Sequence, residues 1–227
     1  MNITAVLLAA GSSTRTQLNT PKQMLSMHGK FLFQHTLEAL MKGYSYKNII
    51  IVVSKKITPT IQGIIKEQYK KHPIHIVSGG ITRQRSIKNS IKYISSNEIP
   101  CDFILFQDAA RPLVVSKDYR RVIVHSLKND GAILVEPARG SIAISIQNQR
   151  IKDHSIALPY MTHSPECYRF ETLQTIYEKP TTKSTSRMTN LELMLKHKKN
   201  IFPVISHQPN LKLTYPEDIA SIRKHLI

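Results

Sequence analysis

The chain opens with Ala5-Val6-Leu7-Leu8-Ala9-Ala10-Gly11-Ser12-Ser13-Thr14-Arg15, and Pro21-Lys22-Gln23 follows shortly after. An apolar run ends here in a loop of small residues, and two cations, Arg15 and Lys22, come next. Small side chains let backbone N–H groups approach a polyphosphate closely, and cations neutralise its charge. The stretch therefore predicts a buried strand whose carboxyl end holds a nucleoside triphosphate.

Two simpler interpretations of this stretch stay open at this point. A secretory signal would place positive charge before the apolar run, whereas the first basic residue here, Arg15, comes after it, so we do not expect one. The other is a buried strand with an ordinary turn, because the loop matches neither G-x-x-x-x-G-K-[ST] nor G-x-G-x-x-G. The loop alone is therefore a weak signal.

The bulk composition indicates a globular protein. With 227 residues and 41% hydrophobic content, residues 1–227 are expected to form a single domain. No apolar run approaches the roughly 20 residues of a membrane span. Cys101 and Cys167 form neither a metal pattern nor a disulfide framework, so we expect a cytoplasmic location.

The formal net charge of +17 admits two explanations. One is binding of nucleic acid, and the other is a solvated surface that also steers anionic substrates. We favour the second, because the sequence has no tryptophan, no recognisable nucleic-acid motif and no aromatic residues interleaved with its basic clusters. These clusters are Lys66, Lys70 and Lys71; Lys88 and Lys92; and Lys196, Lys198 and Lys199.

Short, continuously apolar runs recur along the chain and are typical of strands buried on both faces. They are Ile3–Leu8, Ile49–Val53, Ile74–Val77, Phe103–Phe106 and Ala132–Val135. Segments with helical spacing lie between them, around Phe33–Met41, Ile61–Ile65 and Ile87–Ile91. This alternation predicts an α/β fold with a mostly parallel sheet, whose ligands bind at the carboxyl ends of the strands.

Two later segments depart from this rhythm. Ser141–Gln147 alternates between polar and apolar residues, so residues 137–160 are expected to form a projecting β-hairpin arm that serves as an interface. Thr214-Tyr215-Pro216-Glu217 has the T-x-x-E spacing of a capping box, which predicts a helix start there.

Five segments together resemble the IspD-type cytidylyltransferases, a family that includes 2-C-methyl-D-erythritol 4-phosphate cytidylyltransferase and ribitol-5-phosphate cytidylyltransferases. They are Leu8–Arg15, Pro21–Gln23, Gly79–Ile87, Gln107–Pro112 and Lys212–Asp218, and the resemblance covers nearly the whole chain. The resemblance implies CMP transfer from CTP to a sugar- or polyol-phosphate, with Mg²⁺ and release of pyrophosphate. It also implies a doubly wound, mostly parallel, Rossmann-like sheet with a protruding β-arm that pairs two subunits as a homodimer.

The resemblance also implies roles for individual residues. Arg15, Lys22 and Lys212 are expected to be catalytic, and Asp108 to ligate Mg²⁺. The nucleotide is expected to contact Ala9, Ala10, Gly11, Ser12, Gly79, Gly80, Ser86 and Ala109. Arg83 and Arg111 are expected to brace loops. Taken singly, Arg15 and Lys22 could be surface cations, and Asp108 and Ser86 helix N-caps.

The acceptor side departs from the family pattern. Ser141, Ser164 and Thr189 are the candidate acceptor residues. The usual Asp-Thr-(Ile/Met)-Lys, Thr-Pro-Gln and Thr-Asp-(Asp/Glu) segments read Gly140–Ala143, Ser164–Glu166 and Thr189–Leu191 here, and Arg85 stands where an Asp is usual. We therefore expect a more positive acceptor pocket that favours a more anionic or larger acceptor.

Three alternatives for the activity follow. The first is cytidylylation of 2-C-methyl-D-erythritol 4-phosphate for isoprenoid precursor synthesis. The second is a ribitol-5-phosphate cytidylyltransferase for a surface polymer, and the third is a paralogue that binds CTP without catalysis.

Overall fold

The computed structural model describes residues 1–227 except 12, 14, 15, 17–19, 139–142, 148, 149, 156–159, 181, 183, 184, 186, 207 and 227. For residues 143–147 and 150–155 it describes the backbone alone.

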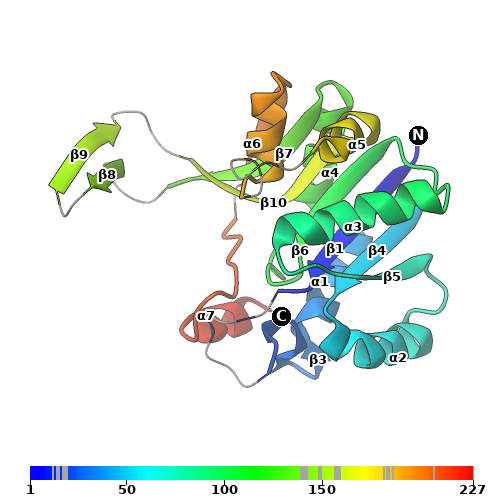
Figure 1. Ribbon diagram of the computed structural model, residues 1–227. Helices are drawn as coiled ribbons and strands as arrows, with labels where there is room; N and C mark the ends of the chain where they lie inside the picture. Colours follow the sequence, from blue (N-terminus) through cyan, green and yellow to red (C-terminus); the bar gives the residue numbers. More distant parts are fainter. Residues whose placement is uncertain are drawn as a thin grey trace.

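A seven-stranded sheet forms the centre of the molecule, in the order β11-β7-β10-β6-β1-β4-β5 (Figure 1). Strand β10 runs antiparallel to both of its neighbours, and the other pairings are parallel. The predicted α/β fold with a mostly parallel sheet is therefore confirmed. The strands are β1 (Ile3–Ala9), β4 (Asn48–Val53), β5 (Ile74–Ser78), β6 (Phe103–Asp108), β7 (Gly131–Pro137), β10 (Tyr160–Arg169) and β11 (Ile201–Ile205).

Helices cover both faces of this sheet, as expected of a doubly wound fold. On one face, α1 (Leu32–Gly43), α2 (Thr58–Gln68) and α4 (Ser116–Leu127) pack on alternate residues of β1 in one core cluster. On the other face, α3 (Arg83–Ser96), α5 (Phe170–Glu178) and α6 (Asn190–Lys196) form a second cluster. Alternate residues of each central strand thus enter opposite cores, which explains the continuous apolar runs.

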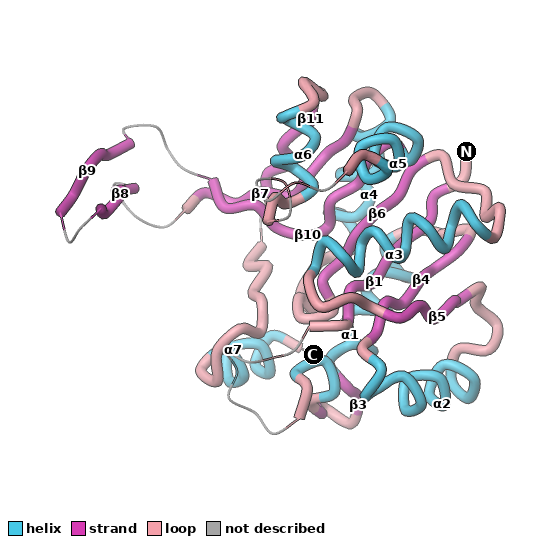
Figure 2. Tube along the Cα trace, in the orientation of Figure 1, coloured by secondary structure: helices cyan, strands magenta, loops and turns pink. Residues whose placement is uncertain are grey.

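Two small two-stranded sheets accompany the central one (Figure 2). Strands β2 (Ser26–Met27) and β3 (Lys30–Phe31) precede α1, after the 3₁₀ turn η2 (Lys22–Met24); a second 3₁₀ turn, η3 (Lys55–Ile57), precedes α2. Strands β8 (Ala143–Gln147) and β9 (Arg150–Ser155) pair antiparallel and lie apart from the central sheet. The predicted pairing across residues 148–149 is therefore present, whereas the dimer-forming role of residues 137–160 stays a prediction.

The last helix corrects one expectation. Helix α7 begins at Asp218 and ends at His225, so Thr214 and Glu217 do not form the predicted capping box. Instead the Asp218 carboxylate accepts hydrogen bonds from the backbone N–H groups of Thr214 (2.7 Å) and Tyr215 (2.8 Å). The carboxylate that ties down this turn is thus one residue later than the T-x-x-E spacing predicts. Among the described residues, no helix has the length and apolarity to cross a membrane.

Candidate active site

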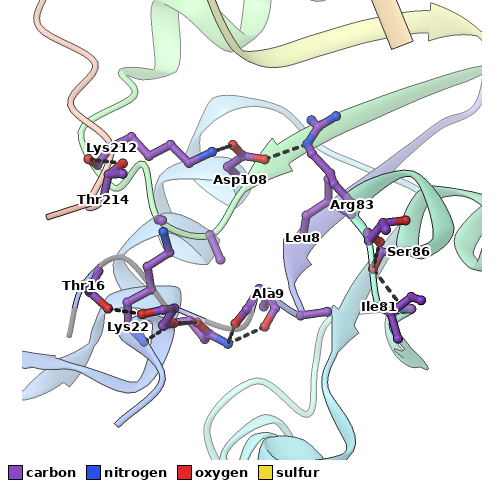
Figure 3. Close-up of a pocket in the computed structure, with 18 residues that line it drawn as sticks. Leu8, Ala9, Thr16, Lys22, Ile81, Arg83, Ser86, Asp108, Lys212 and Thr214 are labelled. Carbon is purple, nitrogen blue, oxygen red and sulfur yellow. Dashed lines mark hydrogen bonds and ion pairs between the residues drawn. The ribbon is translucent and has the colours of Figure 1, made fainter. Parts of the chain in front are cut away.

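A cavity of about 400 Å³ opens at the carboxyl ends of β1 and β6, where the order of the strands reverses. Leu8 of β1 pairs in register with Asp108 of β6, so the two strands deliver their last residues to the same place. The loop after β5 and the segment before α7 complete the walls (Figure 3). Ligands of open α/β sheets bind at this kind of position, and the volume suits a small molecule.

The buried side chain of Gln23 fixes the loop after β1 by hydrogen bonds. Its amide Nε2 donates hydrogen bonds to the carbonyls of Ala9 (2.7 Å) and Gly11 (3.3 Å). The hydroxyl of Ser13 accepts from the backbone N–H of Lys22 (2.8 Å). A Cβ added at Gly11 would meet nothing within 4 Å, so the protein's own packing does not require a glycine there. Because Gly11 is exposed at the cavity, the missing side chain leaves room for a ligand.

The loop after β5 is fixed by Ser86, which is buried at the start of α3. Its hydroxyl accepts from the backbone N–H of Gly80 (3.0 Å) and donates to the carbonyl of Thr82 (3.1 Å). Both glycines of this loop are sterically required. A Cβ at Gly79 would lie 2.3 Å from the Cβ of Ala10, and one at Gly80 would lie 2.2 Å from Cγ of Arg85.

A chain of four alternating charges crosses the cavity wall. Lys212 Nζ lies 2.6 Å from Asp108 Oδ2, and Arg83 Nε lies 3.3 Å from Asp108 Oδ1. The chain ends at Glu166, whose Oε1 lies 2.7 Å from Arg83 Nη2. Burial alone would raise the pKa of Asp108, but Arg83 and Lys212 outweigh it and hold that pKa well below its usual range. Asp108 is therefore an ionised carboxylate across the physiological pH range.

Lys22 links the first part of the chain to the last. Its Nζ donates to the carbonyl of Leu213 (2.7 Å), and the backbone N–H of Leu213 donates to the carbonyl of Ala110 (2.9 Å). The segment before α7 thus supplies Lys212 to the cavity and also holds Lys22 there through the carbonyl of Leu213. Figure 3 shows Lys22 and Lys212 among the residues that line the cavity, with the Lys212 ammonium next to Asp108.

Most of the predicted nucleotide and catalytic residues within the described part of the chain meet here. The cavity is lined by Ala9, Ala10, Gly11, Lys22, Gly80, Ser86, Asp108, Ala109 and Lys212. Gly79 lies behind this wall, where its N–H donates to the carbonyl of Val53 (2.7 Å). Arg15, Ser12 and Ser141 lie outside the described residues.

The two described acceptor candidates differ in position. Ser164 is buried beside the cavity, and its hydroxyl accepts from the backbone N–H of Asp108 (3.0 Å). Thr189 is the N-cap of α6, and its hydroxyl is engaged with Glu192 in a capping box. Thr189 therefore serves the helix, and it does not line the cavity at Asp108.

Sequence reasoning assigned no role to Gln23 or Glu166, although both shape the site. Gln23 stands in the quoted Pro21–Gln23 segment, so its position was visible but its partners were not. Arg83 and Arg111 brace the site, in agreement with the expectation: Arg83 bridges Glu166 and Asp108, and Arg111 is buried and donates to the carbonyl of Asn210.

One carboxylate is available for a metal ion. Among the described residues, no group of three or more His, Cys, Asp or Glu side chains could hold a metal by itself. Mg²⁺ commonly takes one or two carboxylates and completes its shell with substrate phosphates and water. Asp108, an ionised carboxylate in the wall of a cavity that suits a small molecule, fits that mode of binding.

Comparisons with known proteins agree with this geometry. The family model described as 2-C-methyl-D-erythritol 4-phosphate cytidylyltransferase (IspD) matches residues 3–226. A Fusobacterium nucleatum protein of that name is 29% identical over 97% of this chain and 95% of its own length. A ribitol-5-phosphate cytidylyltransferase of Lacticaseibacillus paracasei is 25% identical over 99% of this chain and 97% of its own length.

Solved structures share the fold. The 4-diphosphocytidyl-2C-methyl-D-erythritol synthase of Anaerococcus prevotii superposes with a TM-score of 0.81 at 20% identity, covering 99% of this chain and 96% of that one. The Francisella tularensis 2-C-methyl-D-erythritol 4-phosphate cytidylyltransferase superposes with a TM-score of 0.80 at 18% identity, covering 99% of this chain and 100% of that one. Because the family model spans almost every residue and the site lies where the fold places ligands, the chain belongs to the IspD family and is a cytidylyltransferase.

Proposed function

We propose that this protein transfers CMP from CTP to 2-C-methyl-D-erythritol 4-phosphate and releases pyrophosphate. The observation that carries the proposal is the convergence of Lys22, Lys212 and the ionised Asp108 on one cavity beside the glycine loop that follows β1. A nucleoside triphosphate carries the negative charge that such cations attract, and the exposed Gly11 lets its phosphates approach the backbone. Besides the Fusobacterium nucleatum protein, six further relatives carry this acceptor in their names.

The arrangement suits in-line displacement at the α-phosphorus of CTP. Negative charge builds on the non-bridging and leaving oxygens as the acceptor phosphate attacks, and fixed cations stabilise it without reorganising. Lys22 and Lys212 supply such charges, and both are held in place by hydrogen bonds to Leu213 and Asp108. Arg15 is proposed to act with them. Asp108 is the residue that would hold Mg²⁺, and the bound ion would neutralise charge on the phosphates.

The base is proposed to bind beside the loop after β5. Gly80 and Ser86 line the cavity there, and the hydroxyl of Ser86 fixes the backbone of the loop. Backbone N–H and C=O groups held this rigidly are suited to reading the edge of a pyrimidine. Gly79 contributes indirectly, because it lets this loop pack against Ala10.

A second acceptor, ribitol 5-phosphate, is favoured by one observation, the relative that bears that name. Thr189, a candidate acceptor residue, caps helix α6 and does not line the cavity. Ser164 is the described candidate that remains beside Asp108. We also propose that residues 137–160 pair two subunits and that the enzyme works in the cytoplasm.

The test is pyrophosphate release from CTP or UTP with a panel of polyol phosphates. We expect release with CTP and not with UTP, and the highest kcat/KM with 2-C-methyl-D-erythritol 4-phosphate. A clear preference for ribitol 5-phosphate would support the second acceptor. CTP binding without release by any acceptor would contradict the proposed activity and favour a binding protein without catalysis.

A further inference from the structure

Glu166 is a buried carboxylate on β10 that the proposed reaction does not use. It is 4% exposed, yet it is fully engaged: Oε1 accepts from Arg83 Nη2 (2.7 Å) and Asn190 Nδ2 (3.1 Å), and Oε2 accepts from the Tyr168 hydroxyl (2.7 Å). An unpaired carboxylate in such a place would be strongly destabilising, and these three partners compensate for the burial of Glu166.

The geometry divides Arg83 unequally between two carboxylates. Arg83 Nη2 lies 2.7 Å from Glu166 Oε1, whereas Arg83 Nε lies 3.3 Å from Asp108 Oδ1. Charge-assisted N–H···O bonds are strongest near 2.8 Å and weaken with distance. Glu166 is therefore the principal partner of Arg83, and it restrains the guanidinium from forming a two-pronged pair with Asp108.

We propose that Glu166 is a positioning residue. By holding Arg83, it limits the guanidinium to one 3.3 Å contact with Oδ1 of Asp108 and so keeps that oxygen accessible to Mg²⁺. The inference rests on the proposed function for its kinetic consequence, and on the observed contacts for its structural one. Without the Glu166 charge, the Arg83 guanidinium would form a bidentate ion pair with Asp108 and compete with the metal ion for that carboxylate.

The same contacts indicate that the carboxylate of Glu166 and the amide of Asn190 could exchange positions and still satisfy Arg83. Asn190 is fully buried, and its Oδ1 accepts from the Tyr177 hydroxyl (2.6 Å) while its Nδ2 donates to Glu166. One carboxylate and one amide thus share the space beside Arg83. These are also two of the positions where the chain departs from the family pattern, which has an amide at the first and a carboxylate at the second. The acid missing at Asn190 is supplied by Glu166, so these two departures add no net positive charge to the site.

A double-mutant cycle tests both parts of the proposal. The variants are E166Q, N190D and E166Q/N190D, and the matched control is Y168F, which removes one hydrogen bond to Glu166 without touching Arg83. Three readouts apply: the Arg83 Nε–H signal in arginine-labelled protein, assigned with R83K; the melting temperature; and the Mg²⁺ concentration that half-saturates pyrophosphate release.

E166Q is expected to shift or broaden the Arg83 signal and to raise the half-saturating Mg²⁺ concentration about three- to tenfold, the range of one ordinary hydrogen bond. N190D is expected to lower the melting temperature, because it places a second carboxylate against Glu166. The double variant is expected to be more stable than either single variant and to regain much of the Mg²⁺ dependence of the wild type. Y168F is expected to lose stability with the Mg²⁺ dependence unchanged.

Three results would overturn the proposal. The first is E166Q with an unchanged Arg83 signal and unchanged Mg²⁺ dependence. The second is a double variant no more stable than the weaker single variant. The third is a Y168F variant whose Mg²⁺ dependence changes as much as that of E166Q, since the effect would then come from loosening of the core. If the wild type releases no pyrophosphate with any acceptor, the proposed function fails, and the Arg83 signal and melting temperatures still decide the positioning role.

Discussion

Asp108→Asn is the substitution that most directly tests the electrostatics of this site. The side chain is 14% exposed and its two oxygens contact Lys212 at 2.6 Å and Arg83 at 3.3 Å. Asparagine keeps the shape and removes the charge, so two cations lose their common counter-ion. We expect the free energy of unfolding to fall by about 2 kcal/mol, between the values for an exposed and a buried pair. The melting temperature should fall by about 4–8 °C for a chain of this size.

The loss of stability should depend on pH in a defined direction. The folded-state pKa of Asp108 is held below its unfolded value, which is about 3.9 for a free aspartate. Its charge therefore stabilises the fold fully above that unfolded value, and this contribution disappears as the pH falls through the folded pKa. The wild type and Asp108→Asn should differ most at neutral pH and converge in strong acid, as measured by chemical denaturation across the pH range.

Asp108→Asn should strengthen CTP binding in the absence of Mg²⁺ and weaken the use of Mg²⁺ when the ion is present. Without Mg²⁺, the Asp108 carboxylate repels the triphosphate by about 1 kcal/mol even under water-like screening, so Asp108→Asn should bind CTP about fivefold more tightly. With Mg²⁺ the variant lacks a metal ligand, so the half-saturating Mg²⁺ concentration should rise about tenfold or more. Isothermal titration with and without Mg²⁺ measures the first effect, and pyrophosphate release measures the second.

Asp102→Asn is the matched control. It removes the same charge just before β6, about 20 Å from Asp108 at the strand rise, and Asp102 is 52% exposed. We expect a small stability change and no change in CTP or Mg²⁺ dependence. Weaker binding of metal-free CTP by Asp108→Asn would refute the placement of this carboxylate against the phosphates. An unchanged Mg²⁺ requirement would remove it from the metal site.

Two further substitutions test other parts of the cavity, and a third is a control outside it. Lys22→Ala should leave the Kd for CTP within about tenfold and lower kcat at least about a hundredfold, because its charge acts mainly on the transition state; a preserved kcat in the pyrophosphate assay would contradict that role. Gly80→Ala should weaken CTP binding at least about tenfold, since its Cβ would lie 2.2 Å from Cγ and 2.4 Å from Cβ of Arg85 and the loop must move. Gly63→Ala is its control: nothing lies within 4 Å of the added Cβ in α2, so it should stabilise the protein by up to about 1 kcal/mol with CTP binding unchanged. A destabilised Gly63→Ala, or normal CTP binding by Gly80→Ala, would contradict the steric argument.

The parallel half of the sheet could be predicted from sequence because the signal for each strand, a continuous apolar run, lies within the strand itself. Strands such as β4 and β6 enter a core on each face, so almost every residue is apolar and the run is visible without knowledge of its partners. The site follows from the same signal, since polar or glycine residues directly after these runs must meet at one edge of the sheet. Asp108 and Gly80 occupy such positions, shortly after the runs Phe103–Phe106 and Ile74–Val77.

Strand β10 could not be predicted, for the opposite reason. Six of its ten residues are buried, from His163 to Tyr168, but they include a histidine, a serine and a glutamate. Such a run does not look apolar, because its polar groups are satisfied by distant partners such as Arg83 and Asn190. Partners 83 and 24 residues away in sequence leave no periodic signal. Prediction from pattern therefore fails where burial is compensated by long-range hydrogen bonds.

The site is also assembled by contacts that span almost the whole chain. Lys22 bonds to the carbonyl of Leu213 across 191 residues, and Lys212 pairs with Asp108 across 104. The stretch that supplies both contacts is anchored by apolar packing. Leu213 in this stretch and Ile222 in α7 are both fully buried and belong to the same core cluster as Met27. A cavity built in this way forms only when the first strand, the middle of the sheet and the last helix are all in place. The glycine loop after β1 can therefore hold phosphate only as part of the complete fold, because the cations that face it come from both ends of the sequence.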